Sequence, residues 1–298
     1  MKIFENIKIN ITPKSFTFYA LFLSYGIFLL WFTIPGTITT LSHIFNPLSL
    51  PEPQAGLMSD ILSEHNYIEE LIFTKLPQLF AGIILIIVYI EYIFSKKYAR
   101  LIGIIGNFVY LVYPTYTFLN NWQDVSFSFG TFQSILFYFL PSFTLIILTL
   151  VYWKKLGPNL EIKRKSTGLK FSFRKYSFIA LFLTLGLISF VNVYPILSVI
   201  VQYGFSLWNS EQQLFVVIYT ISSFISMVFL LIAYHGFLYS KKYTIHIGLT
   251  GCIFFIIGYI SQYIFIDISI ILILRLVFYI SPALLLVALS IIYWNKIE

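Results

Sequence analysis

Charged residues are scarce in this chain of 298 residues. Asp, Glu, Lys and Arg together make up 10% of the sequence, whereas about a quarter of a soluble globular domain is charged. Hydrophobic residues make up 59% of it. The composition excludes an ordinary soluble domain and predicts a chain embedded in lipid.

Cysteine is almost absent. The chain has a single cysteine, Cys252, and therefore no Cys-x-x-Cys pair. An intrachain disulfide needs two cysteines, so a disulfide-stapled scaffold is excluded. The redox compartment cannot be read from this residue.

Motifs that carry catalysis or hold cofactors are missing too. The sequence has no Walker A motif, no acid-rich Asp-Asp motif and no Ser, His and Asp set within an apolar run. A haem held between helices needs paired axial ligands, but of the four histidines only His235 lies well inside such a run. We therefore expect no catalytic site, no metal site and no internal haem; a haem held by a partner, or a quinone, stays open.

Long apolar runs dominate what is present. About 20 predominantly apolar residues are needed to cross a bilayer as a helix, and the runs lack the alternation of barrel strands. The sequence thus predicts an all-α polytopic membrane protein with eight transmembrane helices, over residues 15–36, 77–95, 101–119, 132–153, 176–200, 213–237, 245–265 and 269–293.

The basic residues fall on one side of this eight-span arrangement. All Lys and Arg residues except Lys75 and Arg275 lie at inner span ends or inner loops. Cytoplasmic loops are enriched in these residues, so we expect a cell-membrane protein with both termini in the cytoplasm. The same placement explains the net charge of +7 without nucleic acid as a partner.

The first half of the sequence recurs in the second. Three matches keep the same order, pairing Phe18–Gly26 with Phe178–Gly186, Ser95–Tyr98 with Ser240–Tyr243, and Tyr152-Trp153 with Tyr293-Trp294. Ordered matches of this kind indicate an internal duplication. We expect residues 1–155 and 176–298 to form two parallel four-helix repeats, joined by a basic cytoplasmic linker at 156–175, because an even number of spans preserves orientation.

The first copy carries an insertion on the predicted outer face. Residues 37–76 form the only sizeable segment between spans, and Met58, Ile61, His65, Ile68 and Ile72 recur within it at helical spacing. This pattern is typical of an amphipathic helix lying on the membrane surface or against a partner. The segment is therefore the expected docking face for a protein partner, with the lipid bilayer as the other partner.

Five residues are candidates for a functional role. Ionisable residues inside spans are costly and are functional hypotheses by default, which singles out Glu91, His235 and Arg275. His43 and His65 share the outer segment, where histidine could bind a metal or haem, although their spacing matches no strong ligand motif. A structural role at the membrane interface competes with a functional one for each residue.

Two functions are consistent with this sequence. The first is a non-catalytic membrane subunit that anchors an outer-face partner, plausibly in a respiratory electron-transfer complex. The second is a transporter of a small, hydrophobic molecule built from two parallel repeats. The duplication favours transport, while the scarcity of polar residues in the middle of the spans favours the anchoring subunit.

Overall fold

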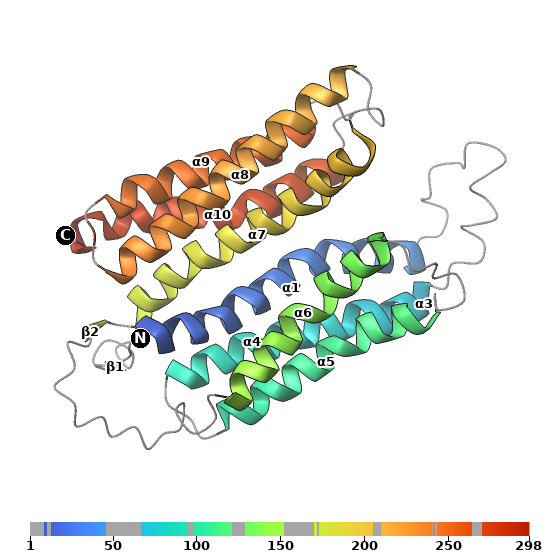
Figure 1. The fold of residues 1–298 in the computed structure, drawn as a ribbon, viewed down its shortest axis with the longest axis horizontal. Coiled ribbons are helices and arrows are strands. Elements are labelled where there is room, and N and C mark those ends of the chain that lie inside the picture. The colour runs from blue at the N-terminus through green and yellow to red at the C-terminus, as the bar shows by residue number, and fades with distance from the viewer. Residues whose placement is uncertain are drawn as a thin grey trace. The chain divides into compact units, whose positions relative to one another are not determined.

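A computed structural model of the chain describes residues 9–10, 13–45, 67–93, 98–120, 129–151, 170–171, 173–204, 210–239, 241, 243–263 and 270–297. Within these ranges the chain is helical apart from short turns and one antiparallel pair of two-residue strands. The predicted all-α class is therefore confirmed (Figure 1).

The described part of each predicted run falls on one long helix. The strands are β1 (Ile9–Asn10) and β2 (Lys170–Phe171), and the helices are α1 (Pro13–Phe45), α3 (Tyr67–Glu70), η3 (Leu71–Lys75), α4 (Leu76–Ile93), α5 (Ala99–Asn120), α6 (Phe129–Val151), α7 (Phe173–Tyr203), α8 (Ser210–Leu238), α9 (Thr244–Tyr263) and α10 (Ile270–Ile297). Here η3 is a π-helical turn, and it joins α3 to α4 without a break.

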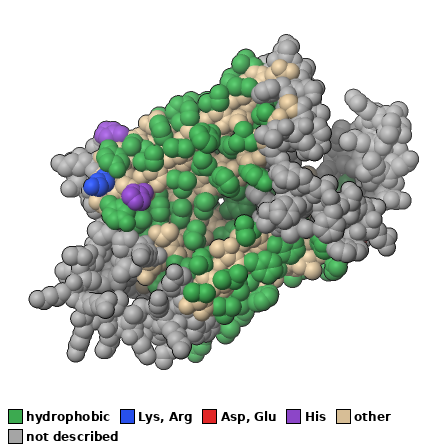
Figure 2. Space-filling model, viewed as in Figure 1, with side chains coloured by type: hydrophobic (Ala, Val, Ile, Leu, Met, Phe, Trp, Pro, Cys, Tyr) green, Lys and Arg blue, Asp and Glu red, His purple; other side chains and the backbone are tan. Residues whose placement is uncertain are grey.

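Five segments of the described helices are long and apolar enough to cross a membrane. They are Ser15–Leu41, Tyr67–Ile93, Ser177–Tyr194, Gln213–Leu238 and Thr244–Ser261. Hydrophobic side chains also cover much of the described surface (Figure 2). Five apolar helices of this length, with so much apolar surface exposed, are consistent with a multi-pass membrane protein.

Helix α1 is longer than the sequence predicts. The first span was expected to end at residue 36, with the outer segment following, but α1 continues to Phe45. Thr37 and Thr39 donate hydrogen bonds to the carbonyls four residues earlier, those of Thr33 and Pro35. These bonds satisfy the hydroxyls inside the helix, so the run of threonines does not end it. Residues 46–66 of the expected outer segment lie outside the described residues.

The chain folds as two compact units. Unit 1 comprises Met1–Ser24 and Lys165–Glu298, and unit 2 comprises Tyr25–Arg164. In unit 1, helices α7 to α10 pack in sequence order and α10 returns to contact α7 (Figure 1). The first part of α1 joins them through a bond from Tyr234 to Thr17.

Glycines allow close helix packing in both units. In unit 1, Gly248 lies against the ring of Phe182 and Gly251 against Leu230. In unit 2, Gly26 of α1 faces Gly82 of α4 so closely that a Cβ on Gly26 would lie 2.8 Å from the Gly82 carbonyl oxygen. The backbones of α1 and α4 therefore meet directly at this point.

A polar cluster at one end of unit 2

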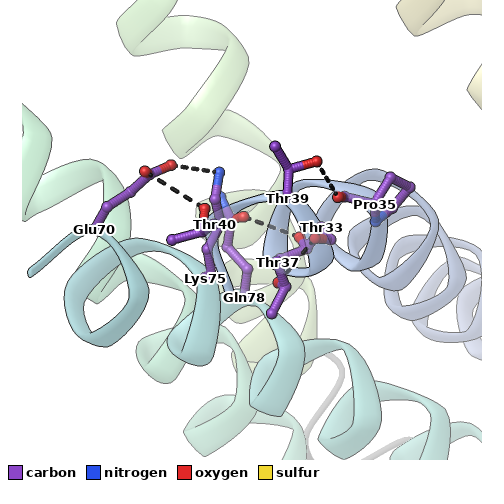
Figure 3. Close-up of polar contacts among 8 residues, drawn as sticks. All are labelled: Thr33, Pro35, Thr37, Thr39, Thr40, Glu70, Lys75 and Gln78. Atoms are coloured by element: carbon purple, nitrogen blue, oxygen red, sulfur yellow. Dashed lines mark hydrogen bonds and ion pairs between the residues drawn. The ribbon is translucent and has the colours of Figure 1, made fainter. Parts of the chain in front are cut away.

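Polar and charged side chains gather at the end of unit 2 where α1 ends and α3 begins (Figure 3). They come from five elements: α1, α3, η3, α4 and α5. We call the following eight residues the polar cluster: Thr33, Thr37, Thr40, Glu69, Glu70, Lys75, Gln78 and Tyr116.

The α1 side of the cluster is a buried threonine face. Thr33, Thr37 and Thr40 are spaced by four and three residues, which places them on one side of the helix. All three are buried, with exposed fractions of 2%, 8% and 4%. The Thr33 and Thr40 hydroxyls bond to α4 and α3, while the Thr37 hydroxyl donates to the Thr33 carbonyl within α1.

A buried hydrogen bond ties α1 to α4. The Thr33 hydroxyl donates to Gln78 Oε1 over 2.9 Å, and Gln78 is 5% exposed. A buried polar group without a partner costs about 1–3 kcal/mol. Removing either side chain would therefore leave a buried polar group of the other without this hydrogen bond.

An ion pair closes the cluster at its half-buried edge. Lys75 Nζ lies 2.9 Å from Glu70 Oε1, and the two side chains are 20% and 25% exposed. Glu70 Oε2 also accepts a hydrogen bond of 3.5 Å from Thr40. Lys75 passes over Gly36 of α1, where a Cβ would lie 3.2 Å from Nζ. The absence of a side chain at position 36 leaves room for the lysine.

The π-turn η3 explains why Glu70 and Lys75 can pair. Residues five apart point to different sides of an α-helix, but they approach each other in a π-helix, whose bonds run from i to i+5. The backbone N–H of Leu76 donates to Leu71 O in this way. Helical turns of this kind occur frequently at functional sites.

Helix α5 completes the cluster through one aromatic side chain. The Tyr116 hydroxyl donates to Glu69 Oε1, and the Tyr116 ring stacks on Phe73 of η3 with centroids 4.8 Å apart. The ends of α1, α3 and α5 are thus linked by side chains. The cluster offers charge and hydroxyl groups for recognition, while among the described residues no group of three His, Cys, Asp or Glu side chains is arranged to hold a metal ion.

The cluster is largely absent from the second sequence copy. Offsets of 160 residues in the first span, as from Ser24 to Thr184, and of 145 in the next two, as from Ser95 to Ser240, give the aligned positions. These positions hold Val193, Leu197, Ile200, Leu214, Phe215, Thr220, Ser223 and Ser261. None of these residues is charged, and five of the eight are apolar.

The structure describes the side chains of two of the five predicted site residues, Glu91 in unit 2 and His235 in unit 1. Glu91 is half-buried near the end of α4, and its Oε2 has no hydrogen-bond partner among the described residues. His235 is exposed on α8, where its ring lies 4.7 Å from that of Tyr239. His43 and Arg275 belong to α1 and α10, but their side chains, like the whole of His65, lie outside the described residues. Their proposed roles stay predictions.

Sequence reasoning missed the polar cluster because it treated Glu69, Glu70 and Lys75 as loop charges outside the second span. The available signal was the contrast with the second copy, in which the aligned residues are uncharged. Comparison with protein-family models, curated proteins and solved structures finds no match to this chain.

Proposed function

We propose that this chain is a non-catalytic integral membrane protein that anchors a protein partner at the polar-cluster end of unit 2. The observation that carries the proposal is the cluster itself, which links the ends of α1, α3 and α5 in one sequence copy only. Large apolar side chains are exposed beside it, including Ile38 at 63%, Ile68 at 58% and Ile72 at 48%. Because side chains link these helix ends, the exposed apolar groups beside them are held in fixed positions. A protein partner could bind against such groups.

The proposed scaffold is eight spans in two parallel four-helix repeats, with both termini cytoplasmic and the polar cluster on the outer face. Helix bounds support the repeat: α7 begins 160 residues after α1, and α9 begins 145 residues after α5. Ser24 and Thr184, which are aligned in the two copies, also hydrogen-bond to each other over 3.1 Å.

The charge of the outer face suggests the chemistry of the partner. The segments assigned to that face carry Glu52, Asp60, Glu64, Glu69, Glu70, Asp124, Glu211 and Asp267, against Lys75 as their one basic residue. A partner with a basic surface would be attracted to this side. Its setting in a respiratory electron-transfer complex is proposed from the sequence alone, and the geometry adds nothing to it.

Site-specific photocrosslinking in the native membrane tests the docking. A photoreactive amino acid is placed at Ile68 of α3 or at Leu214 of α8, which are matched in exposure at 58% and 57%. We expect irradiation to join one discrete protein to position 68 and none to position 214. Equal labelling at both positions, or none at position 68, would contradict the proposal.

A second experiment tests the role of the ion pair. Lys75→Met removes the cation while keeping most of the side-chain length, and Thr220→Met is the control at the aligned position of α8. Lys75→Met should reduce co-purification of the crosslinked partner in mild detergent, whereas Thr220→Met should preserve it. If the wild-type protein purifies without a second protein, with the mass of the single chain, the anchoring function is refuted.

Transport is the second candidate, favoured by buried polar side chains inside unit 2. Asn107 and Ser142 are both 0% exposed there, although polar groups within a membrane helix bundle are costly and often functional. Uptake by proteoliposomes that contain only this chain would support transport over anchoring. We propose no specific substrate beyond a small, hydrophobic molecule.

A further inference from the structure

A fully buried side chain on α5 lacks a hydrogen-bond partner for one of its polar atoms. Asn107 is 0% exposed, and its Nδ2 donates to Gly103 O over 2.8 Å. Its Oδ1 has no partner among the described residues. Rotating the amide by half a turn does not help, because it would set Oδ1 against the Gly103 carbonyl and leave Nδ2 unpaired instead.

Other buried polar side chains of unit 2 lie on α1, α5 and α6. Tyr110 is one turn from Asn107 on the buried side of α5, and its ring centroid is 5.4 Å from that of Tyr25. The Tyr25 hydroxyl is 3.1 Å from Ser142 Oγ of α6. These residues are at most 8% exposed. They form an internal polar core that is separate from the polar cluster.

The second sequence copy replaces this core with apolar residues. The positions aligned with Asn107, Tyr110, Tyr25 and Ser142 are Cys252, Phe255, Leu185 and Ala283, with an offset of 141 residues in the fourth span, as from Phe137 to Phe278. These four residues are equally buried, at 0%, 2%, 1% and 0%. Two cores with the same burial therefore differ in polarity, so burial alone does not explain the polar set.

We propose that the internal polar core of unit 2 binds a water molecule that donates a hydrogen bond to Asn107 Oδ1. An orphan acceptor in a protein interior commonly marks an ordered water, which makes two to four hydrogen bonds to otherwise unsatisfied groups. Hydroxyls of the core are candidates for the remaining bonds.

The two copies would then differ in internal hydration. The core of unit 2 binds a water molecule, whereas the aligned core of unit 1 binds none. A small, largely hydrophobic molecule that carries one polar group would find a hydrogen-bonding position in the core of unit 2, so the inference deepens the transport candidate and rests on it. It does not depend on partner docking, and the two can fail separately.

X-ray radiolysis footprinting of the purified full-length protein in detergent tests the proposal. Hydroxyl radicals formed from bound water oxidise adjacent side chains even when these are buried. Tyr110 and Phe255 are a matched pair, being aromatic, aligned and 4% and 2% exposed. We expect Tyr110 to be oxidised at least about fivefold faster, with oxygen-18 incorporated from labelled water, because only its core holds a water.

A variant supplies the control. Asn107→Leu removes the acceptor and should bring the oxidation rate of Tyr110 down toward that of Phe255, while Phe255 itself is unchanged. A rate for Tyr110 no higher than for Phe255 in the wild-type protein would overturn the proposal, even if the variant fails to fold. An unchanged Tyr110 rate in a folded Asn107→Leu variant would overturn it as well.

Discussion

Replacing Gly26 by alanine should destabilise the protein, whereas the same change at its aligned residue, Gly186, should not. A Cβ on Gly26 would lie 2.8 Å from Gly82 O and 3.1 Å from Ile86 N, both backbone atoms of α4. Ordinary contacts of a Cβ begin at 3.4 Å, so α1 and α4 would have to separate by about half an ångström. No side-chain rotation can relieve this clash.

The expected magnitude follows from two opposing effects. Overpacking costs about 1–3 kcal/mol, and alanine regains up to about 1 kcal/mol over glycine in a helix. Gly26→Ala should therefore lose about 1–2 kcal/mol. At Gly186 the new Cβ would meet side chains of α8, mainly Leu231 Cδ2 at 2.9 Å. Leu231 is only half-buried and can change rotamer, so Gly186→Ala should be close to neutral.

Thermal stability in mild detergent measures the difference. The fraction of protein that remains monodisperse after heating gives a midpoint temperature for each variant. A shift of roughly 2–4 °C per kcal/mol predicts a Gly26→Ala midpoint about 2–8 °C below that of Gly186→Ala. Adding Ile86→Ala should not restore it, because the Gly82 backbone stays in place. Equal midpoints for the two glycine variants would refute the reasoning.

Three further changes have defined outcomes. Thr33→Val should cost about 1–2 kcal/mol by leaving buried Gln78 without its donor, and adding Gln78→Leu should recover part of that loss; thermal midpoints of the single and double variants check this coupling. Gly204 has φ of +64° at the end of α7, so Gly204→Ala should cost about 1 kcal/mol while Gly204→Asn is better tolerated, again by midpoint. Asn192→Leu removes the 2.6 Å hydrogen bond that Asn192 donates to Tyr259. The loss of about 1 kcal/mol of stability should accelerate proteolysis of the detergent-solubilised protein several-fold. An unchanged proteolysis rate would show that this bond does not stabilise the protein.

The sequence predicted the helices well because hydropathy alone decides them. Each of the eight apolar runs needs its backbone hydrogen bonds satisfied internally, and helix formation does so within the run. The prediction was poorest where polar residues continue a helix. Thr37 and Thr39 resemble the start of a loop, yet hydrogen bonds to carbonyls four residues earlier keep them in α1.

The polar cluster was beyond sequence reasoning for a different physical reason. Glu70 and Lys75 are five residues apart, a spacing that an α-helical pattern assigns to different faces. Only the π-turn brings them together, and nothing in an isolated helix predicts where it forms. Asn107 was overlooked because it is a single polar residue in an apolar run. Its alignment with Cys252 was the signal that could have identified it.

The hydrogen bond between Ser24 and Thr184 has a consequence for the origin of the chain. If the two halves descend from one shorter gene, these residues were once the same residue. In a homodimer, a residue touches its own copy only beside the two-fold axis. The half-length ancestor would then have been a homodimer with both copies oriented the same way, already in contact at this serine or threonine before fusion. Fusion freed each half to change on its own, and the unequal cores at Asn107 and Cys252 are what such freedom permits.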